Sequence, residues 1–250
     1  MRVLWYLRTF QPGLHWPHSS MAQPFDEAER AAVYRAIHER RDMRHFTPGP
    51  VDPAVLARLL DAAHHAPSVG YMQPWRIVRI TSAALREQLH ETVERERVAT
   101  ADALGKRRDE FMKLKVEGMR DCGELLVVAL MDRREAHIFG RRTLPEMDLA
   151  SVACAIQNMW LAARAEGLGM GWVSIFDVDE VRALLHMPAG AKPVAILCVG
   201  HVAEFYPKPM LEIEHWAERR VLGKCVYENR WLDEPTEAAP QAESAGTGSA

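Results

Sequence analysis

The chain has 250 residues, of which 48% are hydrophobic and 26% are charged, so it can close a substantial core as one domain. Its net charge of −3 and its pI near 6.4 exclude a general binder of nucleic acids or acidic membranes, because such proteins need a dominant basic field. No apolar run approaches the roughly 20 residues of a spanning helix. The four cysteines form no C-x-x-C pair. We therefore expect a cytoplasmic protein with reduced thiols and no metal site.

Both ends of the sequence are predicted to lie outside the folded domain. Residues 1–24 interleave Arg, Trp, Pro and His without the apolar stretch of a secretory signal, and we expect a flexible arm. Residues 233–250 are rich in Pro, Ala, Ser, Glu and Gly, and they bury too little apolar surface to offset their ordering entropy. We expect a disordered tail there, which leaves residues 25–232 as the domain.

Two helices are predicted at the start of this domain. Asp26 and Glu29 have the spacing of a capping box, ahead of a helix that carries Val33 and Ile37 on one face. This helix runs into Arg40. A second helix starts at residues 52–53, where Asp precedes Pro, and it ends before the proline at position 67.

The middle of the chain begins with a turn at 67–75 and a predicted strand at 75–81. Residues 84–121 are strongly charged, and their pattern predicts one or two amphipathic helices that break at Gly105. This helical excursion is a candidate lid.

Alternating strands and helices fill the second half. Short apolar runs at 125–132 and 193–200 predict buried strands. Between them, a helix over 145–166 turns Leu149 and Trp160 inward and stops at Gly167. An extended segment at 170–176 and a short helix at 178–185 follow. The expected fold class is α+β, a mixed sheet with helices packed on it.

The segment Arg40-Arg41-Asp42-Met43-Arg44 is the first candidate for chemistry. Three guanidinium groups within five residues repel one another unless an anion or carboxylates lie among them. A bound phosphate would satisfy them. The alternative is a solvated helix end in which Glu39 and Asp42 are ion-pair partners, and the charge density alone leaves both open.

Two further segments suit a flat ligand. Ser68, Gly70 and Gln73 offer a hydroxyl, a flexible backbone and an amide between a helix and a strand, although a well-made turn needs the same residues. The glycines at 167, 169 and 171 follow a helix, so the dinucleotide mechanism at a helix start does not apply. They allow close backbone approach to a ring, with Ser174 nearby. Adjacent His64 and His65 do not share a helical face, which argues against a common metal.

Four segments occur in one order and spacing: RRDMRHF, APSVGYMQPW, MDLASVACAIQNMWLAARAEGLGMGWVSIF and AILCVGHV. Together they resemble the flavin-dependent nitroreductase superfamily over nearly all of residues 25–232. Within it, the chain is similar to the aerobic 5,6-dimethylbenzimidazole synthases. Asp42 stands where ordinary nitroreductases usually carry Ser, Tyr71 stands where they commonly carry Asn, and Ser174 lies in an unbroken GWVSIF segment.

The resemblance implies a nitroreductase-like fold, with a mainly antiparallel mixed sheet flanked by helices, in a homodimer whose flavin sites lie at the subunit interface. It implies that reduced FMN is the substrate as well as the cofactor. Dioxygen would cleave it into 5,6-dimethylbenzimidazole, the lower ligand of vitamin B12, and erythrose 4-phosphate.

The resemblance also implies roles for individual residues. Arg40, Arg41 and Arg44 would hold the phosphate and ribityl end, with Arg219 as a weaker candidate. Asp42 and Ser174 are the implied catalytic residues. The full implied FMN-binding set is Arg40, Arg41, Asp42, Met43, Arg44, Ser68, Met72, Gln73, Gly171, Trp172, Ser174 and Arg219.

Two other functions stay open from the sequence. A conventional NAD(P)H-dependent FMN nitroreductase or quinone reductase would turn over without losing flavin, and a storage or delivery protein would only bind it. Two routes to reduced FMN also stay open: reduction by this chain, and supply by a separate flavin reductase with NAD(P)H as an indirect electron source.

Overall fold

A four-stranded sheet forms the centre of the computed structural model, which describes residues 23–231. Apart from positions 23 and 24, the predicted arm and the predicted tail lie outside the described residues. All three strand pairs are antiparallel, and the strand order is β1-β2-β4-β3. The strands are β1 (Trp75–Arg79), β2 (Glu124–Leu130), β3 (Gly169–Val173) and β4 (Lys192–Gly200).

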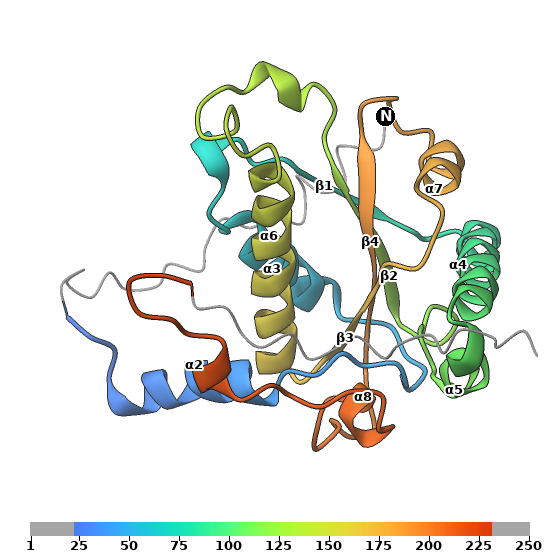
Figure 1. The fold of residues 1–250 in the computed structure, drawn as a ribbon, viewed down its shortest axis with the longest axis horizontal. Helices are drawn as coiled ribbons and strands as arrows, with labels where there is room; N and C mark the ends of the chain where they lie inside the picture. The colour runs from blue at the N-terminus through green and yellow to red at the C-terminus, as the bar shows by residue number, and fades with distance from the viewer. Residues whose placement is uncertain (1–22, 232–250) are drawn as a thin grey trace, which may run out of the picture.

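Helices cover both faces of the sheet (Figure 1). One face packs against α3 (Pro53–His64) and α6 (Met147–Ala165), and the other against α4 (Ala83–Ala103) and α7 (Val178–Leu184). Strand β2 is buried along its whole length, and alternate side chains enter the two cores. The predicted α+β class with a mainly antiparallel sheet is confirmed. No helix among residues 23–231 is long and apolar enough to cross a membrane.

Local signals fixed most element boundaries. Asp26 and Glu29 exchange the two hydrogen bonds of a capping box at the start of α2 (Glu27–Glu39), at 2.8 and 2.9 Å. Asp52 caps α3, and Gly167 follows α6 with a φ of +75°. The remaining short elements are η1 (Val69–Tyr71), η2 (Gly105–Arg107), α5 (Arg108–Lys113), η3 (Arg134–Ala136), α8 (Met210–Ile213) and η4 (Leu222–Lys224).

Helix α2 differs from the sequence expectation of an amphipathic helix that covers a core. None of its residues is buried, and its apolar face exposes Val33, Tyr34 and Ile37. Leu149 of α6, which was predicted to face inward, is also exposed. Periodicity predicts which residues share a face, but it does not say whether that face meets the same chain.

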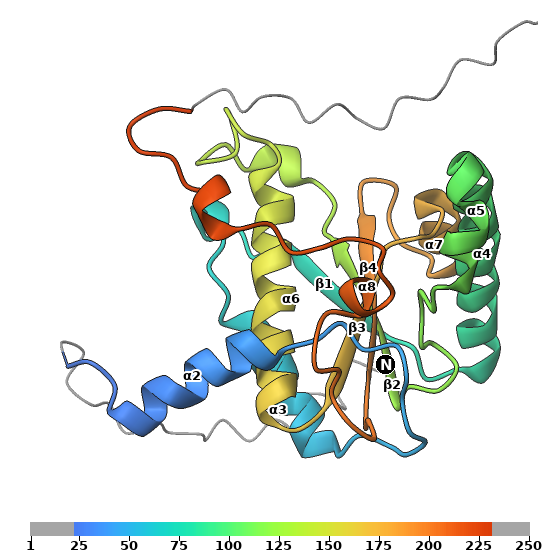
Figure 2. The same ribbon diagram turned by 60° about the horizontal axis from the view of Figure 1, so that its bottom comes forward.

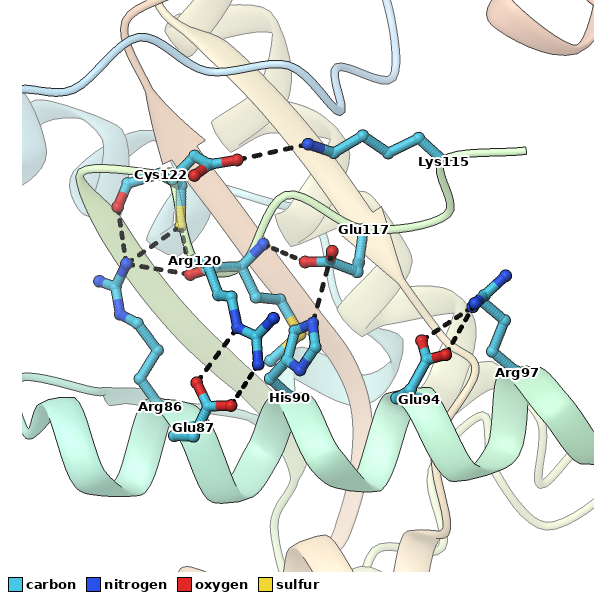
Figure 3. Close-up of polar contacts among 11 residues, drawn as sticks. Arg86, Glu87, His90, Glu94, Arg97, Lys115, Glu117, Arg120 and Cys122 are labelled. Carbon is cyan, nitrogen blue, oxygen red and sulfur yellow. Dashed lines mark hydrogen bonds and ion pairs between the residues drawn. The ribbon is translucent and has the colours of Figure 1, made fainter. Parts of the chain in front are cut away.

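The charged excursion becomes α4, η2 and α5, with the predicted break at Gly105, where φ is +55°. Residues 114–121, which were predicted to be helical, form an irregular segment instead. Arg86 on α4 holds this segment by donating to the carbonyl oxygens of Met119 (3.0 Å) and Cys122 (2.7 Å) (Figure 3). Arg86, which is half-buried, thereby joins the Met119 and Cys122 carbonyls to α4.

A hollow of about 850 Å³ lies along the outer side of α4. Three ion pairs involve charges that line it: Glu87 with Arg120, Glu94 with Arg97, and Arg95 with Glu180 (Figure 3 shows the first two). His90 faces Glu117 at 3.6 Å. Two of these pairs thus attach α4 to its neighbours, through Arg120 before β2 and Glu180 of α7, whereas the Glu94–Arg97 pair lies within α4.

A buried carboxylate anchors the loop between β2 and α6. Asp148, whose side chain is 8% exposed, accepts from Arg134 Nε at 2.9 Å and from Arg141 Nε at 3.2 Å. Both arginine side chains are themselves largely buried. Removing the carboxylate would leave two buried cations without their common partner.

We therefore expect Asp148→Ala to lower the free energy of unfolding by about 3 kcal/mol in urea denaturation. Asp109→Ala is the control, because Asp109 forms only an exposed ion pair with Arg108 and should change stability by less than about 1 kcal/mol. Equal effects of the two variants would contradict the anchoring role of Asp148.

Candidate active site

The arginine segment is attached to the outer edge of the sheet. The Met43 N–H donates to the Met170 carbonyl at 3.0 Å, and Asp42 and Met170 form a parallel bridge. The Trp172 N–H donates to Asp42 Oδ1 at 2.9 Å. Residues 42–43 thus extend the sheet beyond β3, and the Asp42 carboxylate takes the place of a backbone acceptor at that edge.

Arg44 holds the second carboxylate oxygen. Its Nη2 donates to Asp42 Oδ2 at 2.6 Å and to the Trp172 carbonyl at 2.8 Å. The Arg44 side chain is only 9% exposed, whereas that of Asp42 is 44% exposed. The Trp172 N–H and Arg44 therefore hold the Asp42 carboxylate on the side that faces the sheet, and its other side remains exposed to solvent.

Gly171 permits this arrangement. A Cβ at this position would lie 2.6 Å from Arg44 Nη1 and would also collide with the Met43 carbonyl. Any side chain here would push Arg44 away from Asp42. The glycine that was predicted to allow close approach of a ring thus has a demonstrated role in close approach of the arginine segment.

Two donors of Arg44 have no partner. Its Nε and Nη1 are buried without a hydrogen bond among the described residues. Because a buried unpaired donor is costly, a bound acceptor at this place would be stabilising.

Although the Asp42 carboxyl is open on one side, the protein around it removes part of its hydration and raises its pKa, and the opposing effects of Arg44, the Trp172 N–H and Arg40 do not cancel that increase. Burial likewise lowers the pKa of Arg40; Asp42 opposes this, and the nearby charges of Arg41 and Arg219 lower it further. The Arg40 guanidinium lies 4.5 Å from the centre of the Trp160 ring. The positive charge of Arg219 also acts on Arg40.

The three arginines do not converge on one point. The Arg41 guanidinium donates to the carbonyl oxygens of His38, Arg40 and Pro207 at 2.7, 2.8 and 3.0 Å. Arg44 points inward to Asp42, whereas the Arg40 guanidinium lies over the Trp160 ring. Glu39, the expected partner in a solvated helix end, pairs with Arg35 and Arg164 instead.

Trp160 is a site neighbour that the sequence did not reveal. Its Nε1 donates to the Arg41 carbonyl at 3.1 Å, and its ring lies 6.4 Å from that of Trp172. Helical periodicity assigned Trp160 to the core, and its burial is consistent with that assignment. Only the tertiary structure shows that it also supports the arginine segment.

The loop at 67–75, predicted to contact a flat ligand, contains a second cluster of candidate site residues. The Gln73 N–H donates to Ser68 Oγ at 3.1 Å, so this hydroxyl closes the loop itself, and Met72 is buried. Gly70, Tyr71 and Gln73 have φ values of 52°, 54° and 50°, an unusual conformation for the two non-glycine residues.

The two groups lie along the same helix. Ser151 near the start of α6 accepts from the Val69 N–H at 3.0 Å, whereas Trp160 supports the arginine segment nine residues later. Nine residues of helix span about 14 Å. The structure therefore separates Ser68, Met72 and Gln73 from the Asp42 cluster by roughly that distance along α6.

Ser174 is exposed and directly follows β3, two residues after Trp172. Its neighbour Ile175 packs with Phe111 and Leu114 of the α5 region. Ser174 therefore lies between the Asp42 cluster and the helical excursion. Met43 is fully buried, and Arg219 is exposed in the C-terminal segment.

Comparison with known sequences identifies relatives over most of the chain. Residues 37–201 match the nitroreductase family. The 5,6-dimethylbenzimidazole synthase of Rhodospirillum rubrum is 41% identical over 198 residues, which cover 78% of this chain and 94% of that protein. A 5,6-dimethylbenzimidazole synthase of Rhodobacter capsulatus is 39% identical over 197 residues, with 78% and 95% coverage.

Solved structures share the fold. An iodotyrosine deiodinase bound to FMN and 3-iodo-L-tyrosine has a TM-score of 0.62 at 22% identity, covering 80% of this chain and all of that one. The NADPH:FMN oxidoreductase of Vibrio harveyi has a TM-score of 0.61 at 20% identity, with 81% and 79% coverage. On its sequence match and its relatives, this chain belongs to the nitroreductase family.

Proposed function

We propose that this protein is a 5,6-dimethylbenzimidazole synthase, which uses dioxygen to fragment reduced FMN into 5,6-dimethylbenzimidazole and erythrose 4-phosphate. The observation that carries the proposal is the Asp42 carboxylate, held by the Trp172 N–H and Arg44 beside Ser174. The names of the two relatives support the same reaction.

The residues present fit FMN at both of its ends. Arg40, on which the charge of Arg219 also acts, is a cation suited to a phosphate. Arg44 offers two buried, unpaired donors beside Gly171, which suit acceptor atoms nearer the ring. Because Arg41 is bound to carbonyl oxygens, its role is to hold the segment, with the phosphate contact assigned mainly to Arg40.

Reduced FMN supplies the electrons and the carbon skeleton, and dioxygen is the oxidant. Asp42 is the group that takes up or releases a proton, since its raised pKa brings it nearer to neutral pH than an ordinary carboxyl. The Ser174 hydroxyl is the second proton-handling group. The helical excursion packs against Ile175 and is the candidate lid, which would have to close over the exposed Ser174 to exclude water from it.

The alternatives predict different fates for the flavin. A nitroreductase would oxidise NAD(P)H through many turnovers and keep FMN intact, and a delivery protein would bind FMN unchanged. The synthase consumes one FMN for each benzimidazole formed. A separate flavin reductase, using NAD(P)H, is a candidate supplier of the reduced FMN.

The direct test incubates the purified protein with chemically reduced FMN in air and follows flavin and fragments by mass spectrometry. We expect loss of FMN with matching amounts of 5,6-dimethylbenzimidazole and erythrose 4-phosphate. Flavin that is merely reoxidised, with no fragments, would exclude the synthase.

Ser174→Gly should lower the rate of benzimidazole formation by at least about 100-fold, since a positioned proton-transfer group contributes about 10²–10⁴-fold. FMN affinity should stay within about threefold, because the Ser174 hydroxyl is exposed and makes no hydrogen bond to any other residue of the described 23–231 region. Ser82→Gly, which removes only the cap of α4, is the matched control for loss of a hydroxyl. Equal product yields from Ser174→Gly and the control would remove Ser174 from the mechanism.

We also propose that the protein is a homodimer. The supporting observation is apolar surface left uncovered on α2 and on the loop before α6, where Tyr34, Ile37, Phe139 and Leu144 are exposed. An isologous contact between two copies would cover it.

The chain mass is 28.3 kDa, and we expect sedimentation at twice that mass. Ile37→Asp should shift the protein toward the monomer, because it places a charge in the apolar face of α2. Val98→Asp introduces the same charge on α4 and should leave the dimer intact. A monomeric wild-type protein would contradict the proposal.

A further inference from the structure

Residues 205–207, which follow β4, clamp the arginine segment on the side away from β3. Pro207 accepts from Arg41 Nη2 at 3.0 Å. The Tyr206 hydroxyl oxygen accepts from the backbone N–H groups of Arg44 and His45, both at 3.2 Å. Nothing at residues 42–45 in the sequence indicates this contact, which spans about 160 residues of the chain.

The hydroxyl of Tyr206 fills a gap in the backbone pairing of this segment. Met43 N–H pairs with Met170, and Thr47 N–H pairs with His201. Between these two bonds, the amides of Arg44 and His45 have no backbone acceptor among residues 23–231. One phenol oxygen therefore satisfies both donors.

The orientation of the phenol follows from counting donors and acceptors. A tyrosine hydroxyl has two acceptor positions and one proton. The two amides occupy the acceptor positions, so the proton is directed to His45 Nδ1, which lies 2.6 Å away. The His45 and Tyr206 rings meet edge to face, with centres 6.0 Å apart. Each hydrogen-bonding position of the hydroxyl is thus used.

We infer that Tyr206 is a positioning residue that fixes Asp42 by holding the amides of Arg44 and His45. Tyr206 holds the backbone of Arg44, and the guanidinium of Arg44 holds the second oxygen of Asp42. Loss of the phenol oxygen would therefore free Arg44 to move, and with it the Asp42 carboxylate relative to the Trp172 N–H. The inference rests on the proposed function where it concerns the reaction. Displacement of a reacting group by about 1 Å costs up to about 100-fold in rate.

Tyr206→Phe removes the hydroxyl and keeps the ring, which packs against the core. Amide hydrogen exchange, read by NMR, should become at least tenfold faster at Arg44 and His45. It should also become faster at Trp172, whose N–H is bound to the Asp42 side chain. The rate of benzimidazole formation at saturating reduced FMN should fall about 10- to 100-fold, with FMN affinity changed less than threefold. Tyr227→Phe is the control: it removes a phenol hydroxyl that donates to the Lys224 carbonyl at 3.4 Å in the C-terminal segment, and it should change neither quantity.

Three results would overturn the inference: unprotected Arg44 and His45 amides in the wild-type protein, a Trp172 amide unaffected by Tyr206→Phe, or a rate within twofold of wild type. The wild-type exchange measurement applies even if the variant does not fold. Exchange does not depend on turnover, so a wild-type protein that leaves FMN intact would refute the synthase while the exchange data still test the positioning of Asp42.

Discussion

The hydrogen bond from the Trp172 N–H to the Asp42 carboxylate is the interaction on which the site depends. It occurs at the free edge of β3, where an outer strand would otherwise supply a backbone oxygen. The side chain of Asp42 supplies that oxygen instead. The sheet edge thereby contains a carboxylate. Its Oδ1 accepts from the Trp172 N–H and its Oδ2 is paired with Arg44.

This arrangement explains why arginine and aspartate occur together in one short segment. Arg44 is buried and compensates the carboxylate, Arg41 binds carbonyl oxygens, and Arg40 lies over Trp160, where the charge of Arg219 also acts on it. Each of the three arginines thus has a different set of contacts. Burial still raises the pKa of Asp42, which suits proton transfer at neutral pH.

Sequence reasoning predicted the parts of the fold that local chemistry determines, such as the capping box at Asp26 and the stop at Gly167. It also selected the arginine segment. It could not predict where each guanidinium points, because deciding contacts such as Arg41 with Pro207 and Arg44 with Trp172 join segments more than 100 residues apart. Tyr206 and Trp160 were missed for the same reason, since no local pattern separates a supporting aromatic residue from core. The exposed face of α2 shows a different limit. Periodicity predicted which residues of this helix share an apolar face, but not that the rest of the chain leaves this face exposed.

The most direct test of this account compares wild type with Asp42→Asn, which keeps the side-chain volume and an acceptor for the Trp172 N–H. FMN affinity and the single-turnover rate of benzimidazole formation would be measured on the same samples. We expect affinity within about threefold of wild type and a rate lower by about 100-fold or more. A variant that fragments reduced FMN at the wild-type rate would contradict the central role of the Asp42 carboxylate.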